Sequence, residues 1–199
     1  MRPLNALHAS ASTLVLAAAA TNNTSPPSTS HVVPSLWDGS CYYPISDPDF
    51  HLDTYLGRWY QVAGTLAPFT RGCKCIHADY ALNDNGTVRV KNGCERDGQV
   101  TGILGAAAPA DPAYGADGVF RVQFPGQPAP DCPGPNYIVQ DYTGDMAIVQ
   151  SNNFTTLFIL SREQFPEEAK LDDWIERAGL LGANLDEVAK TDQTDCVQE

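Results

Sequence analysis

The segment Val119-Phe120-Arg121-Val122-Gln123-Phe124 alternates apolar and polar side chains with a period of two residues. Neighbouring side chains of a β-strand point to opposite faces, so Arg121 and Gln123 are predicted to face solvent. Asp79 and Gln140 hold the outward position in two further runs of this kind. The inward face is therefore predicted to be aromatic and aliphatic, and it comprises Ile76, Ala78, Tyr80, Phe120, Val122, Phe124, Tyr137 and Val139.

Short apolar runs of this type recur at regular intervals, each bounded by Gly, Pro, Asn or Asp. The clearest connection is Asn83-Asp84-Asn85-Gly86, which predicts a tight hairpin because Asn and Gly tolerate positive φ. The pattern is typical of an all-β antiparallel meander. Eight strands are predicted, over residues 58–66, 75–82, 87–92, 100–107, 119–124, 137–141, 146–150 and 155–161.

In the last third of the chain the apolar residues repeat with the period of a helix instead of that of a strand. Residues 166–179 place apolar side chains at i, i+3, i+4 and i+7, which predicts one amphipathic helix whose apolar stripe packs on the outside of the sheet. Pro166 and acidic residues in the first turn favour its start, and Gly179 favours its end. A short ninth strand is predicted over 186–191. The apolar stripe consists of Leu171, Trp174, Ile175 and Ala178.

Composition and charge narrow the class of protein. The chain has 199 residues, and 12 Lys and Arg against 24 Asp and Glu give a formal net charge of −12. That length suits one domain with a sizeable core. The negative charge, with no basic cluster to offset it, would repel a phosphate backbone, so nucleic acid is excluded as a partner. No apolar run reaches the roughly 18 residues that a transmembrane helix needs, so none is predicted.

The N-terminal residues are predicted to lie outside the fold. Residues 1–20 combine Arg2, an apolar stretch and a small-residue end, which is typical of a secretory signal peptide. Residues 21–40 are predicted to be a disordered polar linker, because the segment is rich in Pro, Ser and Thr. A single domain over 41–199 then follows, and the protein is expected to be secreted.

Six cysteines remain after the predicted cleavage, which in an exported chain implies up to three disulfides with 15 connectivities. An alternative uses Cys73, Cys75, His77 and Cys94 as a zinc site, but thiols in an oxidising compartment are expected to pair, so no metal is predicted. Glycosylation sequons at Asn85 and Asn153, and further ones at Asn22 and Asn23, agree with a secretory route.

Three short motifs occur in order along the chain. Gly57-Arg58-Trp59-Tyr60 lies at the first strand, Asp141-Tyr142 follows the sixth, and Arg162 follows the eighth. With the terminal helix, this set resembles the lipocalin family, and the segments 55–60, 75–80 and 190–196 are most similar to its apolipoprotein D-like and bacterial members. The resemblance spans residues 41–196. It implies an eight-stranded antiparallel up-and-down barrel with one C-terminal α-helix packed outside.

The resemblance also implies roles for these residues. Gly57, Trp59, Asp141, Tyr142 and Arg162 would form a structural motif at the closed end, with the Arg162 guanidinium across the Trp59 ring. Cys75 would pair with Cys196, and Cys41 would tie the N-terminal coil to the barrel, with Cys132 as the inferred partner. If the hairpin pairs Leu82 with Thr87, Cys73 lies diagonal to Cys94, so a third disulfide is expected there.

A barrel of this kind is predicted to bind and carry a small hydrophobic ligand, such as a fatty acid, a sterol or another lipid-like molecule. The hydroxyls of Tyr80 and Tyr137 could orient one polar end of that ligand. The alternative is that the inner side chains simply fill a dry core. Loops 108–117 and 125–135 are expected to border the cavity. The predicted lining is Tyr80, Phe120, Val122, Phe124, Tyr137, Val139 and Phe158.

Catalysis has little support in the sequence. There is no G-x-S-x-G, H-E-x-x-H or glycine-rich phosphate motif, and the inner faces carry no paired carboxylates. Within the predicted domain the only histidines are His51 and His77, and His77 is predicted to face outward. The protein is therefore expected to be neither an enzyme nor a cofactor protein. A lipocalin-fold isomerase or de-epoxidase, and a secreted structural glycoprotein, remain the alternatives, and weak self-association is left open.

Overall fold

A computed structural model describes residues 32–66, 69–115, 117–128 and 130–197. All of them lie in one compact unit, His31–Glu199. The expected signal peptide, most of the expected linker, and the sequons at Asn22 and Asn23 lie outside the described residues.

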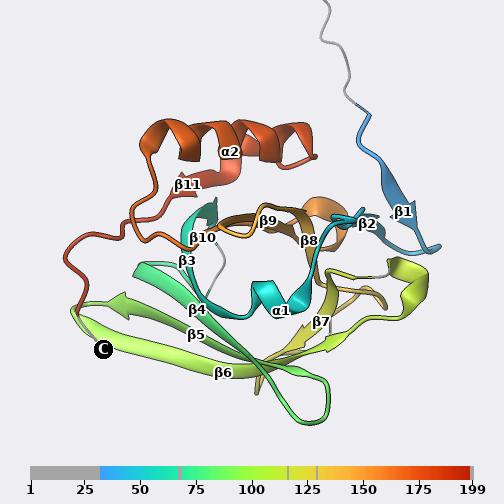
Figure 1. Ribbon diagram of the computed structural model, residues 1–199, viewed down its shortest axis with the longest axis horizontal. Helices are drawn as coiled ribbons and strands as arrows, with labels where there is room; N and C mark the ends of the chain where they lie inside the picture. The colour runs from blue at the N-terminus through green and yellow to red at the C-terminus, as the bar shows by residue number, and fades with distance from the viewer. Residues whose placement is uncertain (1–31, 67–68, 116, 129, 198–199) are drawn as a thin grey trace, which may run out of the picture. The chain divides into compact units, whose positions relative to one another are not determined.

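Eight antiparallel strands form a closed barrel in which sequence neighbours pair and the last strand returns to the first (Figure 1). The pairing of Phe158 with Gly64 belongs to this closing seam. The fold class and all eight strands are confirmed. The strands are β3 (Gly57–Thr65), β4 (Lys74–Leu82), β5 (Val88–Arg96), β6 (Gln99–Pro109), β7 (Val119–Gln123), β8 (Tyr137–Tyr142), β9 (Met146–Gln150) and β10 (Leu157–Ser161).

Strand β5 extends four residues beyond its predicted end at residue 92. The extra residues lack apolar alternation, and they are held in the sheet by the tight turn that follows them. Asp97 and Gly98 both adopt positive φ, 52° and 72°, and this turn pairs Arg96 with Gln99. The predicted hairpin at Asn83 is confirmed by the backbone hydrogen bond from the Asn83 N–H to the Thr87 carbonyl, 2.8 Å.

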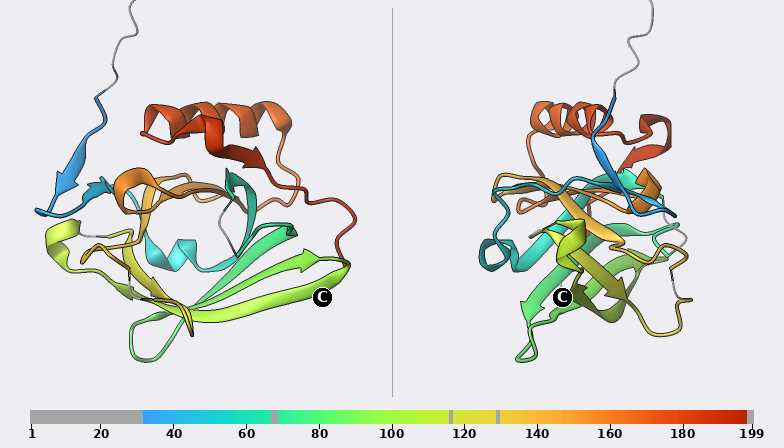
Figure 2. Two further views of the ribbon diagram at one scale, coloured as in Figure 1. Left: turned by 180° about the vertical axis from the view of Figure 1, so that it is seen from behind. Right: turned by 90° about the vertical axis from the view of Figure 1, so that its right-hand side faces the viewer.

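Helix α2 (Glu168–Leu180) covers the outer face of β3, β9 and β10, as predicted (Figure 2). Its Leu171, Trp174 and Ala178 are buried against outward-pointing residues of the barrel such as Met146 and Ile148. The ninth strand is also confirmed as β11 (Val188–Lys190), which pairs with β3. The 3-10 turn η3 (Leu185–Glu187) connects the two elements.

The N-terminal coil is more ordered than the sequence indicated. The disordered linker was predicted to extend to residue 40, but Ser35–Trp37 forms strand β1, which pairs with β2 (Tyr42–Pro44). The Asp38 carboxylate stabilises the turn between them, because it accepts hydrogen bonds from the N–H groups of Ser40 and Cys41. The short helices that complete the fold are α1 (Leu52–Tyr55), η1 (Pro112–Tyr114) and η2 (Asn152–Phe154).

Three disulfides join Cys41 to Cys132, Cys73 to Cys94 and Cys75 to Cys196, which are the expected pairings. The sulfurs of the alternative zinc set are thus all in disulfides. Across residues 32–197, as far as they are described, no group of three or more His, Cys, Asp and Glu side chains could hold a metal ion. No helix in that same part of the chain is long and apolar enough to cross a membrane.

The register of β4 against β5 differs from the one assumed for the Cys73 disulfide. Leu82 pairs with Val88 and not with Thr87, so the register is offset by one residue near the hairpin. A bulge between Lys74 and His77 then restores the assumed register, because Lys74 pairs with Glu95. Near the Cys73–Cys94 disulfide, β4 and β5 therefore pair in the register on which the prediction rested. At the hairpin end of the same two strands the register is shifted by one residue.

The C-terminal segment closes a gap between β3 and β4, which pair only through residues 57–60 of β3. The Gln193 side chain is buried there and donates to the carbonyls of Gln61 (3.0 Å) and Ile76 (2.9 Å). Just beside it, the Cys75 N–H donates to the Asp192 carbonyl, 2.7 Å. The Cys75–Cys196 disulfide therefore holds a segment that completes the barrel wall.

Candidate functional site

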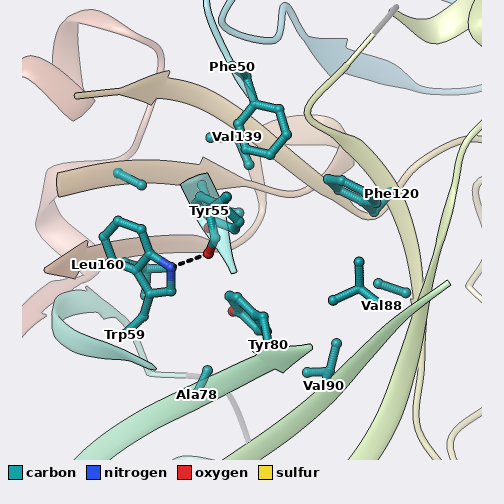
Figure 3. Packing of buried hydrophobic residues seen from close by; sticks show 13 residues of the cluster. Phe50, Tyr55, Trp59, Ala78, Tyr80, Val88, Val90, Phe120, Val139 and Leu160 are labelled. Carbon is teal, nitrogen blue, oxygen red and sulfur yellow. Dashed lines mark hydrogen bonds between the residues drawn. The ribbon is translucent and has the colours of Figure 1, made fainter. Parts of the chain in front are cut away.

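One end of the barrel is closed by Trp59 and Arg162. The Trp59 ring is fully buried, and its Nε1 donates to the Tyr55 carbonyl at 2.8 Å, the dashed contact in Figure 3. The Arg162 guanidinium lies 3.8 Å from the Trp59 ring centroid. It also donates to the carbonyls of Arg58, Thr54 and Leu56 at 2.7–2.9 Å. These contacts tie β10, α1 and β3 together, so Trp59 and Arg162 are structural.

Gly57 is needed at this closed end for its backbone conformation. Its φ is +97°, a backbone conformation that residues with a Cβ rarely adopt and that glycine adopts easily. A Cβ at this position would lie 3.4 Å from Arg162 Nη1. The glycine therefore lets the chain turn from α1 into β3 directly beneath the guanidinium.

The Asp141-Tyr142 motif connects the barrel to helix α2 and to the N-terminal coil. The Asp141 carboxylate accepts a hydrogen bond from Arg177 Nε of α2. Burial raises the pKa of Asp141 above its ordinary value, against the opposing effect of Arg177. The Tyr142 N–H donates to the Asp47 carboxylate, 2.7 Å, and its ring packs against Phe50 and Tyr55. Both residues are structural.

A cavity of about 560 Å³ lies inside the barrel, within the range of small-molecule sites. The alternative of a core filled solid by side chains is therefore wrong for this structure. Most of its wall is aliphatic and aromatic, from β4, β5, β6, β7 and β10. Six residues of the predicted lining border it: Tyr80, Phe120, Val122, Phe124, Tyr137 and Phe158.

Val139 was predicted to line the cavity but does not. It points inward, as its alternation indicated, and it belongs to the same buried cluster as Tyr80 and Phe120. Phe50, from the segment that precedes α1, lies next to it in Figure 3. Because the N-terminal coil crosses the barrel end there, Val139 is fully buried under it and has no exposed surface.

Three tyrosines from different elements meet at the inner end of the cavity, which we call the floor. Tyr137 Oη lies 2.6 Å from Tyr55 Oη and 3.0 Å from Tyr80 Oη. Tyr55 and Tyr80 stack with their ring centroids 5.6 Å apart. Burial raises the pKa of Tyr80 to about 12, and it raises the pKa of Tyr55 and of Tyr137 well above the usual value for tyrosine. All three hydroxyls therefore stay neutral at physiological pH.

Tyr55 was missed as a cavity residue, although it stands directly before the Gly57-Arg58-Trp59 motif. It lies in the four-residue helix α1, where no alternation could assign a face. Asn92 was also missed. It lines the cavity from β5, and its buried Oδ1 has no hydrogen-bond partner among the described residues.

His77 was predicted to face solvent, and this is wrong. Its side chain is buried at the cavity wall, with Nδ1 2.9 Å from the Cys75 carbonyl oxygen. The bulge between Lys74 and His77, where Cys75 adopts a φ of 57°, interrupts the alternation on which the prediction rested. Gly93 pairs with His77 and leaves room for the ring, since a Cβ at Gly93 would overlap His77 Nε2.

The two loops expected to border the cavity behave differently. Gln127, from the 125–135 loop, lines the cavity near Phe124. The described residues of the 108–117 loop do not, because Tyr114 packs edge-on against Tyr43 of the N-terminal coil, 4.8 Å between centroids. The remaining residues at the opening come from the β3–β4, β5–β6 and β9–β10 connections: Phe69, Thr70, Arg96, Ser151, Asn152, Thr155 and Thr156.

The chemistry that this cavity offers is binding by burial. Among the described residues its wall carries no Asp or Glu, and its one arginine, Arg96, lies at the opening. The tyrosine hydroxyls are neutral and bonded to one another. The arrangement therefore suits an apolar molecule with few polar atoms. The described wall offers no carboxylate to act as a general acid or base, and its histidine, His77, has Nδ1 against the Cys75 carbonyl.

The sequence is similar to known proteins over most of its length. A family model described as a lipocalin-like domain matches residues 50–193. Apolipoprotein D of Mus musculus is 31% identical over 167 residues, which cover 79% of this chain and 85% of that protein. Temperature-induced lipocalin-1 of Arabidopsis thaliana is 30% identical over 156 residues, which cover 75% of this chain and 82% of that protein. Neither relative is named as an enzyme.

Solved structures with the same fold are more distant in sequence. The cockroach allergen Per a 4 superposes with a TM-score of 0.57 at 18% identity, over 78% of this chain and 96% of the allergen. Insecticyanin of the tobacco hornworm Manduca sexta gives a TM-score of 0.55 at 19% identity, over 79% of this chain and 91% of insecticyanin. At these identities the likeness concerns the fold alone.

Proposed function

The chain belongs to the lipocalin family, and on that premise we propose that it is a secreted carrier of a small hydrophobic ligand. The observation that supports this most is the cavity of about 560 Å³, lined mainly by apolar side chains, inside a barrel whose one end is closed by Trp59 and Arg162. A ligand that buries about 300 Å² of apolar surface gains roughly 7 kcal/mol at ~25 cal/mol per Å². Ordering costs reduce this gain to affinities on the order of micromolar.

Displacement of a fluorescent probe tests the carrier proposal. The secreted full chain would be titrated with N-phenyl-1-naphthylamine, and the bound probe would then be displaced with a fatty acid and with a sterol. We expect saturable binding with about one probe per chain, and unchanged recovery of the displacing lipid. A probe that never saturates, or a lipid that is chemically converted, would contradict a simple carrier.

Two adjacent residues of β6 provide a matched pair of variants. Ala107 is buried on the cavity side, whereas Ala106 is exposed on the opposite face. Ala107→Trp should fill the cavity and abolish probe binding, and Ala106→Trp should leave it unchanged. If circular dichroism shows that Ala107→Trp does not fold, Val122→Trp tests the same cavity from a half-buried position.

Secretion is the second part of the proposal. Three disulfides within one small domain are characteristic of an oxidising compartment. Expression of the full chain in a secreting eukaryotic cell should release protein into the medium, with a mature N-terminus near Thr21 by Edman sequencing. Protein retained in the cytosol with Met1 intact would overturn this part.

We also propose glycosylation at Asn85 and Asn153, with the higher occupancy at Asn85. Both asparagines are exposed, but the Asn85 side chain bonds only within its own hairpin turn, where its Oδ1 accepts from the N–H and the hydroxyl of Thr87. The Asn153 side chain is engaged in the fold, because its Oδ1 accepts from the Tyr42 N–H at 2.8 Å and its Nδ2 lies 3.5 Å from Cys132 Sγ. Mass spectrometry of peptides released by peptide-N-glycosidase in heavy-oxygen water would measure both occupancies, and equal or reversed values would contradict this ranking.

A further inference from the structure

The three tyrosine hydroxyls at the cavity floor hold one more hydrogen-bond donor than they use. Tyr55, Tyr80 and Tyr137 have three O–H groups, and two hydrogen bonds join them, both through Tyr137. Each bond consumes one donor, whichever way it points. One O–H is therefore left over, and the described residues provide no other acceptor for any of the three hydroxyl groups.

The spare donor lies where water is scarce and a ligand can reach it. Tyr55 is 2% exposed and Tyr80 9% exposed, and all three side chains border the cavity. In Figure 3 the Tyr55 and Tyr80 side chains lie close together between Trp59 and the valines of β5. A buried donor without a partner costs free energy, so a ligand that supplies an acceptor there gains affinity beyond that of apolar burial.

The charges around the cavity decide which acceptors fit. A carboxylate at the floor would be buried without an ion-pair partner among the described residues. Arg96 belongs to the wall only at the opening, where it donates to the Phe69 carbonyl. Arg162 is the nearest cation to the floor, but it does not line the cavity, and its guanidinium covers Trp59 and donates to backbone carbonyls. A neutral oxygen carries no such desolvation cost.

We propose that the tyrosine cluster selects ligands that end in a neutral hydrogen-bond acceptor, such as a ketone, aldehyde, ester or alcohol oxygen, and seats that end at the floor. This rests on the proposed carrier function and specifies its ligand class. The apolar body of the ligand then extends along the apolar wall, past side chains such as Val90 and Phe158, toward the opening.

Two ligands of matched length test the proposal. 2-Dodecanone accepts a hydrogen bond but cannot donate one, and dodecane can neither accept nor donate. The difference between their affinities therefore measures the effect of a hydrogen-bond donor in the cavity. Both would compete with N-phenyl-1-naphthylamine on the secreted full chain and on the triple variant Tyr55→Phe, Tyr80→Phe, Tyr137→Phe, which keeps every ring. We expect the triple variant to bind the ketone about tenfold more weakly and dodecane within twofold of wild type.

Two further variants check the counting of donors. Tyr142→Phe removes a buried hydroxyl that does not line the cavity, so it should change neither affinity. Tyr80→Phe leaves two hydroxyls joined by one hydrogen bond, hence still one spare donor, and should keep most of the preference for the ketone. Equal losses for both ligands in the triple variant, or no loss for the ketone, would overturn the proposal.

The carbonyl stretch of bound 2-dodecanone provides a readout that needs no variant. Infrared difference spectra of the wild-type complex should show this band at lower frequency than in hexane, since hydrogen bonding weakens the C=O bond. An unshifted band would overturn the donor proposal while leaving the carrier function intact. If neither of these two ligands displaces the probe but the fatty acid or the sterol does, this inference fails while the carrier function stands; if none of the four displaces it, both fail.

Discussion

The closed end of the barrel predicts a strong distinction between two arginines that lie close together. Arg162 donates to three backbone carbonyls at 2.7–2.9 Å and to a fourth, that of Gly144, at 3.5 Å, and it covers the Trp59 ring at 3.8 Å. Arg58 forms a bidentate pair with Asp79, at 2.6 and 2.8 Å, on the barrel surface. The substitution Arg→Lys keeps the charge at both positions but removes the planar fork of donors.

The expected loss at Arg162 follows from its contacts. A lysine ammonium can keep one of the three carbonyl contacts, so two hydrogen bonds of about 1 kcal/mol each are lost. The weaker contact with the indole ring costs about 1 kcal/mol more. Arg162→Lys should therefore lower the free energy of unfolding by about 3 kcal/mol. For a domain of this size, that corresponds to a fall in Tm of about 6–12 °C.

Urea unfolding followed by tryptophan fluorescence, with disulfides intact, measures this loss. Arg58→Lys is the matched control, and its surface ion pair should cost less than about 1 kcal/mol. The slope of free energy against urea should stay the same, because the surface exposed on unfolding is unchanged. If Arg162→Lys loses less than 1 kcal/mol, or no more than Arg58→Lys, the structural role assigned to Arg162 is wrong.

Three further results are expected. Hydrogen bonds from the Tyr43 hydroxyl and then the Cys41 N–H lower the pKa of Asp38 to about 2. The ionised carboxylate therefore stabilises the fold above pH 4, and this stabilisation is lost as the pH falls toward 2. Acid unfolding of Asp38→Asn should lack that part of the pH dependence, and curves identical to those of wild type would refute this role of Asp38. Gly64→Ala should cost about 1–3 kcal/mol in urea unfolding, because the new Cβ would overlap the Leu157 carbonyl oxygen; unchanged stability would contradict this packing. Replacing both cysteines of the Cys75–Cys196 disulfide with serine should lower stability by about 2–4 kcal/mol and speed amide exchange in residues 191–197, whereas unaltered exchange there would show that the segment is held without it.

Local sequence patterns predicted most of the framework. The strands were found because β7 and its neighbours alternate with a period of two, and helix α2 was found because its apolar residues repeat with the period of a helix. The short motifs indicated how the barrel closes, and the Arg162–Trp59 contact confirms it. The disulfide partners also followed, from the resemblance and from strand register.

The errors share a cause, which is that alternation assigns a face without saying what covers it. Val139 points inward, but Phe50 and the coil around it cover it. His77 was assigned outward, but the bulge at Cys75 interrupts the pattern just before it. Residues 35–37 look like part of a polar linker, yet they pair with β2 because Asp38 stabilises a turn that only the folded chain completes.

The sequence by itself determined the eight strands, the outer helix and an apolar interior, because each depends on neighbours along the chain, whereas the closing motif followed from the family resemblance. Only the tertiary structure decided that Tyr55, Tyr80 and Tyr137 share one hydrogen-bonded cluster. Tyr55 and Tyr137 are separated by 82 positions and lie on a helix and a strand that meet only when the barrel closes. The polar floor of the cavity, on which the proposed ligand class depends, therefore arises from barrel closure and from no local pattern.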